Sequence, residues 1–297
     1  MDRRGFLKAA GLAAAVSLEA QGQAAQVAQT SQSDITTSVV LDMLGGTIDR
    51  EIEIAAGGGC RTMMMLNQFG AWSDTELNRV DKLCQSNHLT MHGLLAQRDW
   101  KKRPVSIVDP AHREPFLADM KYAIGISQKL GITQLVVTSG LQAAGKSYDE
   151  QWASLTEGVK RAGDLAGEAN FTLLVEPLNS LVDHPGCYLT SCVEGLKLVK
   201  EVNHPHVKLL FDIYHEQIMR GNVIRTLTEA MPQVALIHVA DNPGRNDPGS
   251  GELNFANIYK AIRKTGYKGR IAMEYRPLGD PIASMSKSIR DLSAAFA

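Results

Sequence analysis

Four side chains that can bind a divalent cation each end a short apolar run of the sequence. Three carboxylates crowded together repel one another and take up protons unless a cation neutralises them. Carboxylate oxygens with one imidazole nitrogen suit an ion such as Mn²⁺ or Mg²⁺. The sequence therefore predicts a site for one divalent metal ion, with the ligands Glu176, Asp212, His238 and Glu274.

The spacing of these ligands matches a repeated structural unit. They are 36, 26 and 36 positions apart, close to the roughly 31 residues of an average strand–helix unit in a (β/α)₈ barrel. From Thr37 onward, short apolar runs alternate with segments of helical periodicity. Strands are expected at 39–44, 61–66, 89–95, 133–138, 171–175, 207–211, 234–239 and 270–273.

Helices are expected between and after these strands. Ser73 with Glu76 three residues later is typical of a helix N-terminus, and the other helices are expected at 48–56, 110–130, 149–169, 190–202, 215–230, 255–265 and 282–296. Eight alternating units predict an α/β fold, a single-domain (β/α)₈ or TIM barrel over 34–297. An open doubly wound sheet is the alternative, but no Gly-x-Gly-x-x-Gly follows the first strand. In a barrel, the four ligands would share the rim at the carboxyl ends of the strands.

The first 33 residues are typical of an export signal followed by a linker. A short apolar stretch, Ala9 to Leu18, follows the basic start, and Gln, Ala and Ser dominate after it. The segment Asp2-Arg3-Arg4-Gly5-Phe6-Leu7-Lys8 closely resembles a twin-arginine signal, with Asp2 in place of the usual Ser or Thr. We therefore expect the twin-arginine export machinery as a partner and a periplasmic or extracytoplasmic location.

Composition narrows the function classes further. The chain has 297 residues and a net charge of -1, and 44% of its residues are hydrophobic. The hydrophobic content indicates a globular protein, and the charge lacks the positive excess that is typical of nucleic-acid-binding proteins. No apolar run approaches the roughly 20 residues of a membrane span, so we expect no stable span. The four cysteines form no Cys-x-x-Cys pair, which argues against a zinc ribbon. A small-molecule partner is favoured, and assembly into a homo-oligomer is left open.

Several linked motifs resemble the hydroxypyruvate isomerase family, which belongs with the ketose 3-epimerases to the xylose isomerase-like barrels. The resemblance covers about Val39 to Leu292 and is strongest from Leu174 onward. Its motifs are Glu-Pro-Leu-Asn at 176–179, Pro-Gly-x-Tyr-Leu at 185–189, Phe-Asp-Ile-Tyr-His at 211–215, and the glycine-rich loop at 240–254.

The resemblance implies roles for single residues. The four predicted ligands match the family's metal ligands, and Glu176 and Glu274 also match its acid/base pair. His215 and Arg245 match substrate-contacting positions, and we add Glu252 and His92 as further candidates for substrate binding. Arg245 could hold a substrate carboxylate with two hydrogen bonds.

The implied activity is that of a divalent-metal-dependent isomerase. It would interconvert a short keto acid or ketose with its aldehyde isomer through an enediolate, as in hydroxypyruvate to tartronate semialdehyde. A histidine at the metal-ligand position 238 is more similar to the pattern of the ketose epimerases, so a ketose 3-epimerase is an alternative. A keto-sugar lyase or dehydratase is another. A non-catalytic carbohydrate-binding protein would not need two carboxylates flanking a metal, and it is the alternative of another class.

Overall fold

Eight parallel strands close into a barrel in the part of the chain that the computed structural model describes, residues 35–66, 68–98 and 105–297. The expected signal and linker, 1–33, lie outside these residues. The strands are β1 (Thr36–Val40), β2 (Thr62–Met65), β3 (Thr90–Leu95), β4 (Gln134–Thr138), β5 (Thr172–Glu176), β6 (Val207–Asp212), β7 (Val234–Val239) and β8 (Arg270–Met273). Each strand pairs with the next, and β8 pairs with β1 to close the ring.

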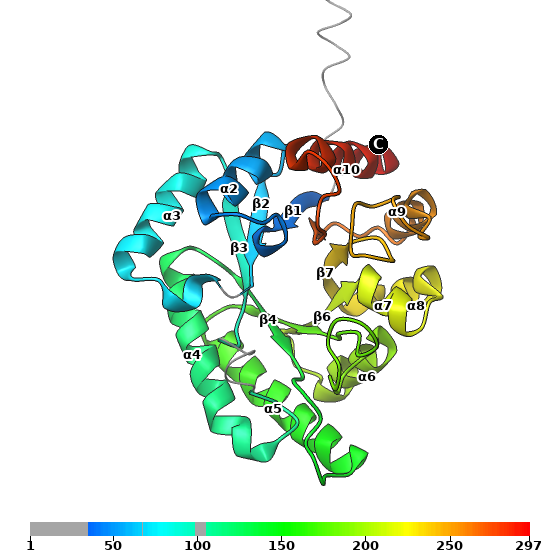
Figure 1. Ribbon diagram of the computed structural model, residues 1–297. Coiled ribbons are helices and arrows are strands. Elements are labelled where there is room, and N and C mark those ends of the chain that lie inside the picture. The colour runs from blue at the N-terminus through cyan, green and yellow to red at the C-terminus, as the bar shows by residue number, and fades with distance from the viewer. Residues whose placement is uncertain (1–34, 67, 99–104) are drawn as a thin grey trace, which may run out of the picture. The chain divides into compact units, whose positions relative to one another are not determined.

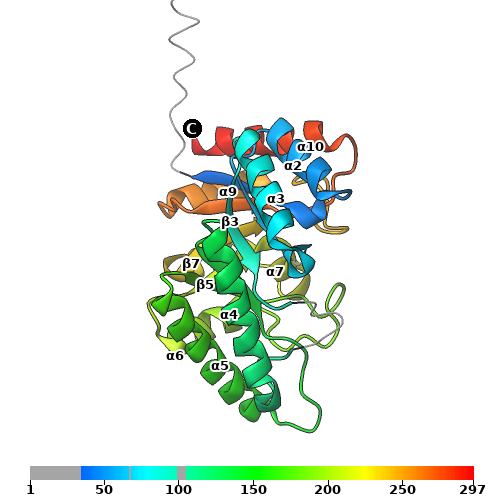
Figure 2. The same cartoon turned by 90° about the vertical axis from the view of Figure 1, so that its left-hand side faces the viewer.

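Helices surround this ring in chain order, as Figure 1 shows by the progression of colour from α2 to α10. The α-helices are α2 (Ile48–Gly57), α3 (Asp74–Ser86), α4 (Arg113–Lys129), α5 (Tyr148–Glu168), α6 (Cys192–Val202), α7 (Ile213–Met219), α8 (Val223–Ala230), α9 (Phe255–Lys264) and α10 (Pro281–Phe296). Short 3₁₀ helices are η1 (Leu41–Met43), η2 (Gln68–Ala71), η3 (Pro110–His112) and η4 (Met231–Gln233). The side view in Figure 2 shows α10 beside α2, where the last unit meets the first. The predicted single-domain (β/α)₈ barrel is confirmed.

Two apolar cores hold the barrel together. Successive side chains of a strand point to opposite faces, so every second residue enters the barrel interior. The inner core contains Val40, Met64, Val136, Leu174, Leu210, Leu236 and Ala272, and the outer core lies between strands and helices. Both faces of the strands are buried, which is why the strands read as nearly continuous apolar runs.

Local signals set the helix starts in several units. Ser147 and Glu150 form a capping box at the start of α5, and Ser73 accepts a hydrogen bond from the backbone N–H of Glu76 at the start of α3. These side chains satisfy N–H groups that have no partner within the helix. The expected helix after Ser73, with Ser73 as its N-cap, is therefore confirmed.

The structure differs most from the expected elements at two places. The first strand covers Thr36–Val40 instead of 39–44, because Leu41–Met43 turn into η1. The carboxylate of Asp42 in this turn accepts a hydrogen bond from the backbone N–H of Leu66 at 2.8 Å. The expected helix at 215–230 is two helices, α7 and α8, separated at Gly221 and Asn222, which both have positive φ. Asn and Gly tolerate that conformation, which ends a right-handed helix.

No helix among the described residues is long and apolar enough to cross a bilayer.

Candidate active site

The four predicted metal ligands lie together at the carboxyl ends of β5 to β8. Each follows an inner-core residue by two positions: Leu174, Leu210, Leu236 and Ala272 precede Glu176, Asp212, His238 and Glu274 respectively. The strand period of two therefore turns the ligands into the barrel mouth, directly above the inner core. One ligand atom from each of the four residues lies within 4.8 Å of the others, and all four residues are buried.

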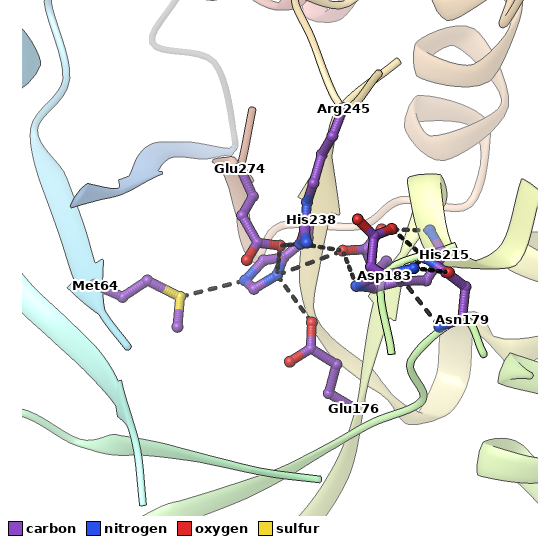
Figure 3. A network of polar contacts seen from close by, with 9 residues as sticks. Met64, Glu176, Asn179, Asp183, His215, His238, Arg245 and Glu274 are labelled. Carbon is purple, nitrogen blue, oxygen red and sulfur yellow. Dashed lines mark hydrogen bonds and ion pairs between the residues drawn. The ribbon is translucent and has the colours of Figure 1, made fainter. Parts of the chain in front are cut away.

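His238 stands among the three carboxylates. Its Nδ1 atom lies 2.7 Å from Oε2 of Glu274, 3.3 Å from Oε1 of Glu176 and 3.9 Å from Oδ2 of Asp212. Figure 3 shows the imidazole ring between Glu176 and Glu274. The imidazole is therefore the group that Glu176 and Glu274 both face.

The charges of this group are strongly coupled. Burial raises the pKa of Glu176, and burial with repulsion from Glu274 raises the pKa of Asp212 to about 8. Burial alone would raise the pKa of Glu274, but attraction by Arg245 and His238 outweighs it and holds that pKa well below its usual range. Burial opposes a charged His238, yet Glu274 and Glu176 outweigh it and raise the pKa of His238 to about 10. The protein alone thus balances these carboxylates with protons and with Arg245.

The donor set fits a divalent cation. Oε1 of Glu176, Nδ1 of His238 and Oε2 of Glu274 are buried, and no described residue gives any of them a hydrogen bond of normal geometry. A buried polar atom without a hydrogen bond is costly. Carboxylate oxygens and an imidazole nitrogen converging at this distance are ligands that one metal ion would satisfy at once.

Arg245 reaches this group from the loop after β7. Its Nη2 atom lies 2.8 Å from Oε2 of Glu274 and 3.7 Å from Oδ2 of Asp212, and its guanidinium lies over the Tyr214 ring, 5.2 Å from the centroid. The side chain is only 9% exposed. The prediction that Arg245 belongs to the site agrees with this position, but in the structure its guanidinium faces two protein carboxylates.

The loop that carries Arg245 is organised by one buried carboxylate, Asp241. Its two oxygens accept hydrogen bonds from four backbone N–H groups at 2.8–3.1 Å, those of Asn242, Gly249, Gly251 and Leu253. The carbonyl of Arg245 in turn accepts a hydrogen bond from the N–H of Arg276 after β8. Asp241 therefore fixes the loop, and Arg276 links it to the neighbouring strand end.

His215 joins the site because Asp212 ends β6 and begins α7. Oδ1 of Asp212 accepts a hydrogen bond from the backbone N–H of His215 at 2.9 Å, which caps the helix. Nδ1 of His215 lies 3.3 Å from the backbone N–H of Asn179 and 2.6 Å from the side-chain nitrogen of Asn179. A backbone N–H can only donate, so Nδ1 is the acceptor and the proton is on Nε2.

The electrostatics keep His215 neutral. Burial and the nearby Arg245 hold the pKa of His215 well below its usual range. Nε2 lies 3.7 Å from Oδ2 of Asp212 and has no hydrogen-bond partner among the described residues. His215 therefore presents a neutral N–H donor next to the candidate metal ligands. Asn179 was not a predicted site residue, although it stands in the Glu-Pro-Leu-Asn motif.

A cavity of about 350 Å³ opens above the metal-ligand group. Its lining includes Glu176, Glu274, His215 and Arg245, and a rim that sequence reasoning did not single out: Asp42, Thr138, Asp183, His184 and Arg276. Asp183 accepts a hydrogen bond from the Asn179 side chain at 2.7 Å, and both residues are labelled beside His215 in Figure 3. The volume suits a small molecule.

The structure places the two remaining candidates elsewhere. His92 is buried low in the barrel, where Nε2 lies 2.7 Å from Oγ of Ser38 and Nδ1 lies 3.0 Å from Oε1 of Gln134. Burial, with Arg270, lowers the pKa of His92 to about 3. Both ring nitrogens are thus engaged below the inner core, and His92 does not line the cavity, so its expected substrate contact is not supported.

Glu252 also lies away from the cavity. Its Oε1 atom accepts hydrogen bonds from the side chains of Gln217 and Asn242, at 3.0 and 2.9 Å. Glu252 lines a larger groove of about 850 Å³ along α9 and α10. Its side chain therefore links α7 to the β7–α9 loop, and the expected substrate contact is not supported.

Comparisons with known proteins agree with this fold. Residues 52–292 match the family described as xylose isomerase-like TIM barrel. The chain is 32% identical over 246 residues to hydroxypyruvate isomerase of Escherichia coli (strain K12), covering 81% of this chain and 93% of that protein.

Two solved structures share the fold. The AP endonuclease, family 2, from Brucella melitensis superposes with a TM-score of 0.78 at 22% identity, over 86% of this chain and 98% of that one. D-psicose 3-epimerase in the presence of D-fructose superposes with a TM-score of 0.71 at 22% identity, over 88% of this chain and 97% of that one. At this identity, the likeness concerns the fold.

Proposed function

Because this chain belongs to the xylose isomerase-like TIM barrel family, we propose that it is an isomerase that depends on one divalent metal ion. Its similarity to a named isomerase along 81% of its length favours an enzyme over a non-catalytic carbohydrate-binding protein. The substrate we propose is a short keto acid or ketose that is converted to its aldehyde isomer. Hydroxypyruvate, giving tartronate semialdehyde, is the first candidate.

The observation that carries this proposal is the buried group of Glu176, Asp212, His238 and Glu274, whose ligand atoms lie within 4.8 Å of one another. These residues would hold the ion, with Mn²⁺ or Mg²⁺ as the candidates. When bound, the ion supplies Lewis acidity that stabilises negative charge on the substrate oxygens.

Glu176 and Glu274 would move the proton. One carboxylate takes a proton from the carbon that bears the hydroxyl group, and the electron pair of that C–H bond forms the enediolate. The adjacent former carbonyl carbon then receives a proton, and the hydroxyl proton passes from one oxygen to the other. Oε1 of Glu176 and Oε2 of Glu274 both face Nδ1 of His238, at 3.3 and 2.7 Å, so a substrate above this group lies within reach of both carboxylates. A positioned acid or base typically contributes about 10²–10⁴-fold to the rate.

His215 and Arg245 would bind the substrate oxygens. The neutral N–H of His215 at Nε2 can donate to a substrate oxygen without adding a charge. Arg245 is held against Glu274 and Asp212, where its positive charge would stabilise the negative charge that develops on the enediolate. Arg276 lines the cavity and is exposed, which makes it a second cation available to an acidic substrate.

Two measurements test this proposal. Elemental analysis should find about one divalent ion per parent chain and little in Asp212→Ala, with Asp183→Asn, a carboxylate of the cavity outside the ligand group, as the matched control. Equal metal content in the parent and Asp212→Ala would contradict the site. The metal-loaded protein is then assayed on short keto acids and on ketoses, with a chelator-treated sample beside it.

The assay also separates the alternatives. Formation of an aldehyde isomer supports the proposed isomerase. Inversion at carbon 3 of a ketose supports a ketose 3-epimerase, the activity named for one structure of the same fold. Loss of water or another leaving group from the substrate supports a dehydratase or lyase.

Export to the periplasm is a separate proposal, based on the Arg3-Arg4 segment. The twin-arginine machinery would carry the folded protein across the membrane after residues 1–33 have served as signal and linker. Replacing both arginines with lysine should leave the precursor in the cytoplasm. Mature protein outside the cytoplasm in that variant would contradict the proposal.

A further inference from the structure

Three successive methionines in β2 differ in their surroundings. Met63, Met64 and Met65 are all fully buried. Met63 and Met65 belong to the outer core under the helices, whereas Met64 belongs to the inner core of the barrel. Met63 and Met65 therefore serve packing between the strands and the helices. Met64 also makes a polar contact.

The sulfur of Met64 lies 3.2 Å from Nε2 of His238. Figure 3 shows this contact on the side of the ring that faces away from Glu176 and Glu274. Nδ1 of the same ring lies 2.7 Å from Glu274 and 3.3 Å from Glu176. The two ring nitrogens thus make different contacts: Nδ1 faces the metal-ligand group, and Nε2 faces the thioether of Met64.

A histidine that binds a metal through one nitrogen usually donates a hydrogen bond from the other, and this bond fixes both the tautomer and the ring orientation. The usual acceptor is a carboxylate, a backbone carbonyl or water. A thioether is a weaker, uncharged acceptor. We propose that Met64 is a positioning residue for His238, because its sulfur accepts the Nε2 proton and reserves Nδ1 for the metal ion. This inference rests on the proposed metal site.

The surroundings explain why a thioether suits this place. The inner core to which Met64 belongs is apolar and includes Val40, Leu174 and Leu236. A carboxylate there would be a fourth buried acid beside Glu176, Asp212 and Glu274, and burying a further charge is costly. The sulfur can satisfy the N–H of His238 while packing as an apolar side chain.

The test compares Met64→Leu, which keeps nearly the same volume but removes the acceptor, with Met64→Gln, which returns an acceptor oxygen. Met63→Leu and Met65→Leu are matched controls on the same strand. The probe is Co²⁺, followed by its visible absorption spectrum and by titration. Nitrogen-15 NMR of His238 in the Mg²⁺-loaded proteins reports which ring nitrogen carries the proton, and thermal unfolding of the metal-free proteins reports stability.

Met64→Leu should bind Co²⁺ about 10-fold more weakly, in the range seen when partners of metal-bound histidines are removed. It should also show a changed His238 spectrum, while its unfolding temperature falls only slightly, because Leu keeps nearly the volume of Met and a single N–H, that of His238, loses a weak acceptor. Met64→Gln should recover at least part of the affinity, and the two control variants should match the parent.

Three results would overturn the inference in distinguishable ways. If the parent binds no Co²⁺, the proposed metal site is wrong and the role of Met64 falls with it. If the parent binds Co²⁺ and Met64→Leu matches it in affinity and spectrum, the role of Met64 alone is wrong. If Met65→Leu loses affinity as much as Met64→Leu does, the effect is general packing and the hydrogen bond is not its cause.

Discussion

Nη2 of Arg245 lies 2.8 Å from Oε2 of Glu274, so a buried cation of the protein faces the oxygen that a metal ion would also attract. Burial alone would lower the pKa of Arg245, but attraction by the carboxylates of Glu274 and Asp212 outweighs it and raises that pKa. Without a metal, Arg245 is therefore a main source of positive charge for three buried carboxylates.

This ion pair predicts that Arg245 contributes more to the stability of the metal-free protein than to that of the metal-loaded protein. Arg245→Gln should lower the free energy of unfolding of the metal-free protein by about 3 kcal/mol, because it leaves buried carboxylates uncompensated. Saturating Mn²⁺ should remove much of this difference, since the ion supplies the missing charge. Thermal unfolding with and without Mn²⁺ measures both values. Arg276→Gln, at the exposed rim, is the control and should change neither.

An equal loss of stability for Arg245→Gln in both states would mean that Arg245 and the metal do not share the same carboxylates.

A second prediction concerns the tautomer of His215. Asn179→Asp places a carboxylate beside Nδ1, which favours a proton there and removes it from Nε2. The kcat/KM should fall by about 10²-fold, as it does when one donor to a developing oxyanion is lost, and His215→Ala should fall similarly. Metal content per chain should stay at the parent level in both. Kinetics with elemental analysis check this, and a parallel loss of metal would contradict the assigned donor role.

Glu51 in α2 gives a prediction about pH and stability. The residue is 2% exposed, and its carboxylate accepts a hydrogen bond from the Gln68 amide at 2.7 Å. Burial, together with repulsion from Asp42, raises the pKa of Glu51 from 4.5 to about 7. The folded state therefore holds this proton more tightly than the unfolded state, and the stability it provides is lost as the pH rises from about 4.5 to about 7.

Glu51→Gln should remove this pH dependence. Above pH 7 the variant should be more stable than the parent by about 3 kcal/mol, and below pH 4.5 the two should converge. Denaturant unfolding across this pH range measures the difference. A parent and variant whose stabilities stay parallel at every pH would show that Glu51 ionises normally.

The barrel and the metal ligands at its rim could be predicted because both follow from the pattern of apolar and polar residues within each strand. The period of two along β5 to β8 links each apolar inner residue, such as Leu174, to the ligand two positions later, Glu176. Strand ends of a parallel barrel share one rim. The residues of that rim could therefore be grouped from spacing alone.

The contacts beyond the rim depend on loops and on depth within the barrel, which spacing does not report. His92 lies in the expected strand but low in the interior, against Ser38 and Gln134. Glu252 follows the glycine-rich loop but turns toward Gln217. The role of Asn179 needs the fold of the β5–α6 loop against α7, because its partner His215 is 36 residues away.

The most direct test of the proposed chemistry is turnover per bound metal ion in Glu274→Gln. The amide keeps the shape of the side chain but cannot take the proton. Preparations of the parent and the variant are brought to the same metal content, which elemental analysis verifies, and are assayed on the substrate that the parent converts. The expected result is a rate per bound ion that is about 10²–10⁴-fold lower in the variant. A fully loaded Glu274→Gln that converts the substrate as fast as the parent would show that Glu274 serves at most as a ligand, and it would contradict proton transfer by two carboxylates.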